Sequence, residues 1–143
     1  MAIWNEWLTW ALLAAFFAAM TAILAKLGVA EVNADFAAFL RTIVVMVAMG
    51  LLVYATGKMH GASTITAKGA IFLVLSGLAT GASWLCYFRA LKLGPASQVA
   101  PVDKLSVVLV VVLAALFLGE RLSLLGWAGA GMMALGAIFV ALG

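Results

Sequence analysis

Five long apolar stretches, separated by short polar segments, constrain this sequence more than any other feature. They cover residues 7–27, 36–56, 70–90, 99–118 and 124–142. A helix that crosses the hydrocarbon core of a bilayer needs roughly 20 mostly apolar residues, and each stretch has about that length. Membrane-spanning β-strands instead alternate apolar and polar residues in segments of about ten. The sequence therefore predicts an all-α integral membrane protein, a bundle of five transmembrane helices.

The composition supports the same fold class. Hydrophobic residues make up 68% of the 143 residues and charged residues 9%, whereas soluble domains contain about 45–50% apolar and about 25% charged residues. Because the spans leave little room for a soluble module, we expect one transmembrane domain over residues 1–143. The lysines and arginines are scattered singly, with no basic run that could follow a nucleic-acid backbone. We expect no nucleic-acid partner.

The cations divide three against five between the two membrane faces, a weak bias. Five spans put the two termini on opposite faces, so Lys58, Lys68 and Arg121 lie on the N-terminal face. The cations on the other face are Lys26, Arg41, Arg89, Lys92 and Lys104. If Arg41 and Lys104 point inward, the remaining counts are equal, and the positive-inside rule selects neither orientation. We therefore predict insertion in both orientations.

Five charged residues lie inside the predicted spans: Lys26 and Arg89 near span ends, and Arg41, Asp103 and Lys104 deeper. Arg41 is five residues into the second stretch, and Asp103 and Lys104 are four and five residues into the fourth. Such groups cost about 2.5–3.5 kcal/mol on insertion scales and mark candidate substrate or ion pathways. We interpret these three as substrate or coupling candidates that face the protein interior as neighbours. A structural ion-pair network is the alternative. For Lys26, Arg89 and Lys92 we expect snorkelling to the headgroups.

Two further features of the spans bear on a site. Ser83, Trp84 and Tyr87 form an aromatic and hydroxyl surface in the third stretch, which suits a small amphipathic or cationic ligand. Hydrogen bonding between helices explains this surface equally well. Pro101, near the start of the fourth stretch, lacks an amide donor, so we expect an irregular first turn there.

Small residues recur at helical spacing in three of the stretches, and such residues let helix backbones approach closely in lipid. The candidate helix-packing residues are Ala18, Ala22, Gly77, Gly81, Gly126 and Ala130. They predict either packing within one bundle or an interface between copies.

Enzymatic chemistry finds no support in the sequence. The single histidine, His60, lies between the second and third stretches, and no HExxH or GxSxG motif is present. The single cysteine, Cys86, has no partner for a disulfide. We expect neither an enzyme nor a bound metal or cofactor.

Two segments in combination resemble the EamA-type branch of the drug/metabolite transporter superfamily. One is RALKLGPAS at residues 89–97, which precedes a proline-led helix, and the other is LGERLS at residues 118–123, before a small-residue final helix. Larger members of this superfamily are similar to two five-helix repeats fused in opposite orientations, with ten helices around a cavity. The resemblance implies that this sequence is one such repeat, half of a ten-helix fold, in a prokaryotic inner (plasma) membrane.

The same resemblance implies a transporter of small organic metabolites or drug-like solutes that works by alternating access as an inverted, antiparallel homodimer. The buried glutamate of the small multidrug exporters is absent from the first stretch, because Glu6 lies at its edge. A flippase for a lipid-linked substrate and a non-transporting membrane subunit are the alternatives.

Overall fold

The computed structural model describes residues 6–143, which are helical almost throughout and contain no strand. The helices long and apolar enough to cross a membrane are Glu6–Val29, Ala34–Ala55, Ala67–Leu93, Ala96–Leu118 and Leu124–Leu142. These five helices begin and end within three residues of the predicted stretches. The prediction of an all-α membrane protein with five spans is confirmed.

Local signals fix the ends of the first three spans, α1 (Glu6–Val29), α2 (Ala34–Ala55) and α3 (Ala67–Leu93). The Asn33 side chain caps α2 by accepting hydrogen bonds from the backbone N–H groups of the second and third residues of that helix. Gly57 follows α2 with a φ of 68°, a left-handed conformation that glycine adopts without strain. A short 3₁₀ helix, η1 (Lys58–Thr64), then leads to α3.

The fourth span is divided into three pieces. It consists of α4 (Ala96–Asp103), α5 (Leu105–Leu113) and a terminal π-helical turn, η2 (Ala114–Leu118). Gly119, with a φ of 68°, ends the span. Ser123 then caps the last helix, α6 (Leu124–Leu142), by accepting a hydrogen bond from a backbone N–H in its first turn.

The irregularity of the fourth span lies at a different residue from the one we predicted. The helix continues regularly through Pro101 and is interrupted at Lys104. The Lys104 N–H is shared between the carbonyls of Ala100, at 3.2 Å, and Pro101, at 3.1 Å. The helix therefore tightens at Lys104, in the turn that follows the proline, and not at the first turn, because the fixed φ of proline is itself compatible with a helix.

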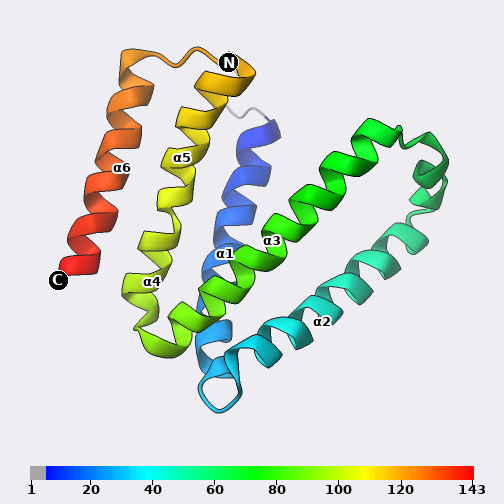
Figure 1. Ribbon diagram of the computed structural model, residues 1–143, viewed down its shortest axis with the longest axis horizontal. Helices are drawn as coiled ribbons and strands as arrows, with labels where there is room; N and C mark the ends of the chain where they lie inside the picture. The colour runs from blue at the N-terminus through cyan, green and yellow to red at the C-terminus, as the bar shows by residue number, and fades with distance from the viewer. Residues whose placement is uncertain (1–5) are drawn as a thin grey trace. The chain divides into compact units, whose positions relative to one another are not determined.

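Contacts divide the chain into two compact units, Ala25–Lys92 and the chain up to Leu24 together with Leu93–Gly143. In the first unit α2 and α3 form an antiparallel hairpin (Figure 1). The buried residues of this unit include Leu91 of α3 and Val29 at the end of α1, which are 0% and 1% exposed.

In the second unit α6 runs antiparallel to α4 and α5 and contacts both (Figure 1). The buried residues on this side are small: Ala114, Ala130 and Ala137. Their size is consistent with close approach of the helix backbones.

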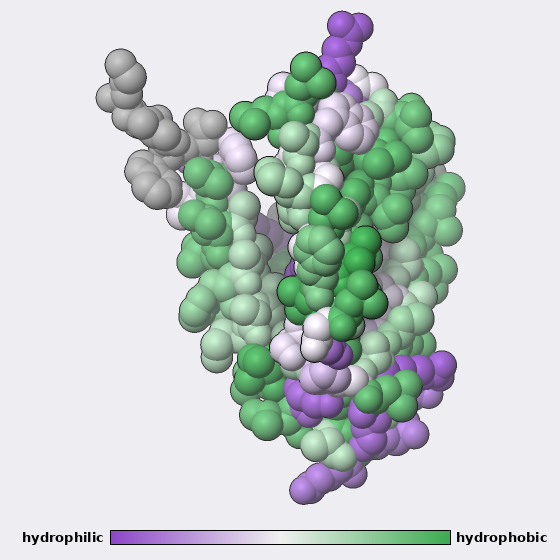
Figure 2. Space-filling model, turned by 90° about the vertical axis from the view of Figure 1, so that its left-hand side faces the viewer, coloured by the Kyte–Doolittle hydropathy of each residue, from purple (hydrophilic) through white to green (hydrophobic). Residues whose placement is uncertain are grey.

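The surface has the distribution expected of spans in lipid. On the face shown in Figure 2, hydrophobic side chains cover most of the helical surface, and hydrophilic side chains gather near the ends. Large apolar side chains such as Phe72 and Val44 are about 61% exposed, so they face lipid or another protein.

Candidate functional site

Arg41 lies over aromatic rings of α3. Its guanidinium carbon is 4.3 Å from the centroid of the Trp84 ring and 5.7 Å from that of Phe88. Trp84 and Arg41 are partly buried, whereas Phe88 is 3% exposed. Arg41 follows the first residue of α2, Ala34, by seven positions, which is about 10 Å along the helix. The structure therefore places a cation of the second span against aromatic side chains of α3.

This contact stabilises the charge of Arg41 without using its hydrogen-bond donors. A cation over an aromatic face gains about 0.5–2 kcal/mol, but the ring accepts none of the five guanidinium N–H groups in conventional hydrogen bonds. Within the described part of the Ala25–Lys92 unit, Arg41 interacts with the aromatic residues Trp84, Phe88 and Tyr87, and the ion pair of this unit joins Asp35 to Arg89 instead. The aromatic rings leave the guanidinium N–H groups able to donate to an oxyanion.

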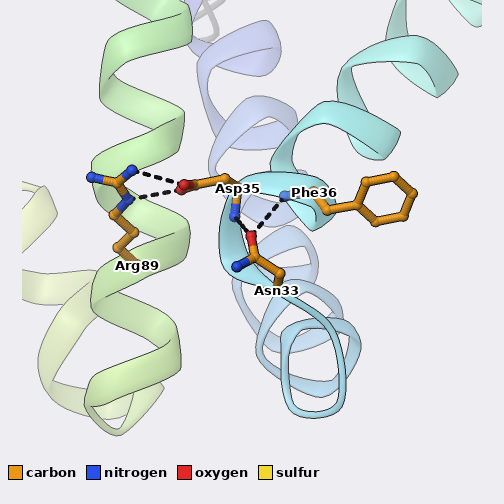
Figure 3. Close-up of polar contacts among 4 residues, drawn as sticks. All are labelled: Asn33, Asp35, Phe36 and Arg89. Atoms are coloured by element: carbon orange, nitrogen blue, oxygen red, sulfur yellow. Dashed lines mark hydrogen bonds and ion pairs between the residues drawn. The ribbon is translucent and has the colours of Figure 1, made fainter.

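Arg89, by contrast, has a carboxylate partner. Its Nε and Nη2 donate to the Oδ1 and Oδ2 of Asp35 at 2.7 and 2.8 Å, a bidentate pair shown in Figure 3. Asn33 holds the first turn of α2 in place by accepting from the backbone N–H groups of Asp35 and Phe36 at 2.9 and 3.2 Å. The Arg89 and Asp35 side chains are 62% and 47% exposed, so this pair sits near the surface of the hairpin.

Two lysines bind backbone carbonyls at the ends of α1 and α3. Lys92 Nζ donates to the carbonyl oxygens of Val29, Ala30 and Val32 at 2.8, 2.6 and 3.2 Å. Lys26 Nζ donates to the Leu91 carbonyl at 2.6 Å. The last carbonyls of a helix lack intrahelical donors, and cations there also interact favourably with the helix dipole. These lysines therefore join α1 to α3.

Asp103 and Lys104 form a pair between neighbours in sequence. Lys104 Nζ lies 3.2 Å from Asp103 Oδ2, at the interruption between α4 and α5. The Lys104 and Asp103 side chains are 56% and 33% exposed. This local pair is one of the arrangements expected from the sequence, and the grouping of Arg41 with Asp103 and Lys104 stays a prediction.

Of the three residues that form the aromatic and hydroxyl surface of α3, Trp84 lies closest to the Arg41 guanidinium in the contacts described. Trp84 contacts the guanidinium, Tyr87 is partly buried and Ser83 is exposed. The Trp84 face thus already holds a cation belonging to the protein. The positive charge of Arg41 on this ring therefore affects which charge a ligand at the surface can carry.

The small-residue candidates differ in their surroundings. Ala22 and Ala130 are each 7% exposed, whereas Ala18 is exposed. A Cβ added at Gly126 would lie 3.2 Å from a methyl carbon of Leu122, the residue one turn earlier.

The glycine pair of α3 has a different environment. A Cβ added at Gly77 or Gly81 would meet no atom within 4 Å in the described part of the chain. Within the described part of the Ala25–Lys92 unit, no other side chain covers this face of α3.

Sequence reasoning missed the partner of Arg89. Asn33 and Asp35 lie in the polar segment between the first two apolar stretches, and an acidic residue in a first turn is an ordinary helix signal. The two members of the Asp35–Arg89 pair are 54 residues apart, and no local pattern specifies that pairing. The hairpin register alone brings them together.

Comparison with known proteins places the chain in a family. The model of the EamA-like transporter family matches residues 5–142. The chain belongs to the EamA-like transporter family. This result confirms the resemblance carried by the RALKLGPAS and LGERLS segments.

A relative from a Sinorhizobium species is named as an uncharacterized transporter in the cobO 3′ region. It is 54% identical over 137 residues, and the alignment covers 96% of this chain and 97% of the relative. The relative therefore has nearly the same length as this chain. No solved structure matches the chain significantly.

Proposed function

We propose that this EamA-family chain is a membrane transporter of small organic metabolites or drug-like solutes, and that it works by alternating access as an inverted homodimer. The observation that carries the proposal is the family match over residues 5–142 of a chain with five candidate spans. A relative of nearly equal length that is named as a transporter supports it. Secondary transporters commonly place their substrate site between two inverted repeats, and a second copy of this chain would supply the second repeat.

The charges near the span ends support an inverted pair. Lys58, Lys68 and Arg121 occupy the N-terminal face, against five cations on the other face, of which Arg41 is stacked on Trp84 inside its span. A bias this weak gives the chain no strong preference for one orientation. Both orientations in one membrane are what an antiparallel homodimer requires.

The open glycine face of α3 gives a second copy a surface to pack against. Gly77 and Gly81 have free space above their Cα atoms in the described structure. Helix pairs in lipid associate through such GxxxG faces because the backbones can approach closely. This surface supports a dimer in which α3 contributes to the interface.

Topology reporters test the inverted pair. Fusing the C-terminus to a reporter active only in the cytoplasm, and separately to one active only outside it, is expected to give signal in both cases. A variant with three added lysines in the segment between α2 and α3 serves as the control, because the added charge should fix one orientation. Signal from a single reporter in the unmodified chain contradicts the inverted homodimer.

Flux measurements test transport itself. The purified chain in proteoliposomes is expected to move organic solutes from a mixed metabolite pool faster than protein-free vesicles do, with and without a proton gradient. The two conditions show whether protons drive the movement. Flux equal to that of protein-free vesicles for every solute in both conditions contradicts the transporter proposal.

A further inference from the structure

Arg41 differs from the other three cations at its end of the Ala25–Lys92 unit. Lys26 and Lys92 donate to backbone carbonyls, and Arg89 is paired with Asp35. Within the described part of this unit, Arg41 lies against the aromatic residues Trp84, Phe88 and Tyr87. The unit thus pairs the cations near the helix ends with oxygen acceptors and places the cation deeper in the span against aromatic side chains.

The guanidinium of Arg41 lies beside Trp84, and this placement argues against snorkelling. Arg41 lies six residues after Asp35 on α2, and Trp84 lies five residues before Arg89 on α3. Because each residue of a helix rises about 1.5 Å, the Asp35–Arg89 and Arg41–Trp84 contacts fit one antiparallel register. It is also closer to Trp84 than to Phe88, which lies one turn nearer the end of α3. A snorkelling side chain would lie toward that end.

The charge of a ligand at this place follows from the cation–aromatic contact. The Trp84 face is already covered by a guanidinium, so a cationic ligand would meet a like charge. An oxyanion would neutralise Arg41 and accept hydrogen bonds from its fork of N–H donors. Neutralising the two charges together lowers the cost of holding either one inside a span.

We propose that Arg41 is the anion-binding residue of the solute path and that it binds a carboxylate or phosphate group through two N–H donors while Trp84 holds the guanidinium in place. This proposal rests on the proposed transport function and deepens it, because it specifies the solutes as small organic anions. The same oxyanion chemistry occurs in lipid headgroups, so the experiment includes a lipid arm.

Binding of matched probes tests the charge requirement. The purified full-length chain in phosphatidylcholine nanodiscs is titrated with benzoate, with phenyl phosphate and with benzamide, which keeps the ring and lacks the negative charge. Benzoate or phenyl phosphate is expected to bind about tenfold or more tightly than benzamide, as for a ligand that gains a hydrogen bond to a charged group. Equal affinity for the three probes, or no binding of either anion in the millimolar range, overturns the proposal.

Variants locate the binding to Arg41. Arg41→Gln is expected to reduce anion affinity by about tenfold or more and to leave benzamide binding unchanged. Arg121→Gln, which removes an exposed arginine outside the spans, is the control and is expected to bind like the unmodified chain. Arg41→Lys keeps the charge and removes the planar fork, so it serves if Arg41→Gln does not fold. Its affinity is expected to fall severalfold, and unchanged anion affinity in the folded variants overturns the proposal.

The lipid arm and the flux measurement separate the remaining possibilities. Competition of phosphatidylglycerol with benzoate, lost in Arg41→Gln, identifies a lipid headgroup as the anion, and absence of competition identifies a water-soluble anion. If no solute moves in proteoliposomes while benzoate still binds through Arg41, the transport function fails and the anion site stands. If solutes move and Arg41→Gln moves all of them at unchanged rates, the anion site fails and the transport function stands.

Discussion

In the Ala25–Lys92 unit, charged side chains join helices that are far apart in the sequence, whereas the unit that contains α4 to α6 packs through small apolar residues. Lys26, Arg89 and Lys92 each bind a group 54 to 65 residues away. In the second unit, the ion pair that the structure shows joins adjacent residues, Asp103 and Lys104.

This difference separates two ways of holding helices together in a membrane. Hydrogen bonds from cations to carbonyls satisfy acceptors near the helix ends that lack intrahelical donors, and they require a particular register between helices. Small residues such as Ala130 let α6 approach α4 and α5 without any polar contact. Matched substitutions in the two units test whether polar contacts stabilise the first unit and small-residue packing stabilises the second.

The largest expected effect is the loss of transport when Asp103 is replaced. Asp103→Asn keeps the shape of the side chain and removes its charge, and we expect it to abolish flux in proteoliposomes. We expect little loss of stability, because partly exposed pairs such as Asp103–Lys104 contribute about 0–1 kcal/mol.

Flux and unfolding in detergent are measured on the same purified sample, with Glu120→Gln as the control at an exposed acid. If the Asp103 variant unfolds together with its loss of flux, the residue has a structural role. Normal flux and normal stability would remove Asp103 from both roles.

The next largest effect is expected on stability in the second unit. Ala130 is 7% exposed, so Ala130→Leu overfills the contact between α6 and its neighbours and should reduce the free energy of unfolding by about 1–3 kcal/mol. Ala128, two residues earlier, is exposed, and Ala128→Leu should leave stability nearly unchanged. Titration with a denaturing detergent measures both variants, and equal stability of the two would contradict packing through small residues.

A smaller loss is expected in the first unit when Lys92 is replaced. Lys92→Met keeps the apolar stem and removes the donor to three carbonyls, so we expect a loss of about 1–2 kcal/mol in the free energy of unfolding. Lys68→Met, at an exposed lysine near the start of α3, is the matched control. A loss in the control as large as that in Lys92→Met would show that the carbonyl contacts contribute nothing specific.

The smallest effect is expected for the exposed pair of Asp35 and Arg89. Their side chains are 47% and 62% exposed, and solvent screens such pairs. Asp35→Asn and Arg89→Gln should each destabilise the chain less than Lys92→Met, and the exchanged double variant Asp35→Arg with Arg89→Asp should recover part of the loss. If the coupling energy in this double-mutant cycle exceeds the effect of Lys92→Met, the Asp35–Arg89 pair contributes more to stability than the Lys92 contacts, contrary to our expectation.

The sequence by itself determined the number and nature of the spans and the family. Hydropathy is a property of each segment, so 20 apolar residues in a row predict a membrane helix whatever their neighbours are. For the same reason, the charge of Arg41 within its span was visible from the sequence. We expected an irregular first turn near Pro101, but the fourth span is interrupted at Lys104, because the fixed φ of proline is compatible with a helix and the proline alone does not locate the irregularity.

Only the tertiary structure decided which partner each charge takes. The sequence places Lys26, Arg41, Arg89 and Lys92 near one membrane face without indicating their partners, and in the structure two bind carbonyls, one binds Asp35 and one lies over Trp84. These choices depend on the register and rotation of α2 against α3 and of α1 against α3. No single segment encodes those quantities, because they are set by how side chains from different helices pack together.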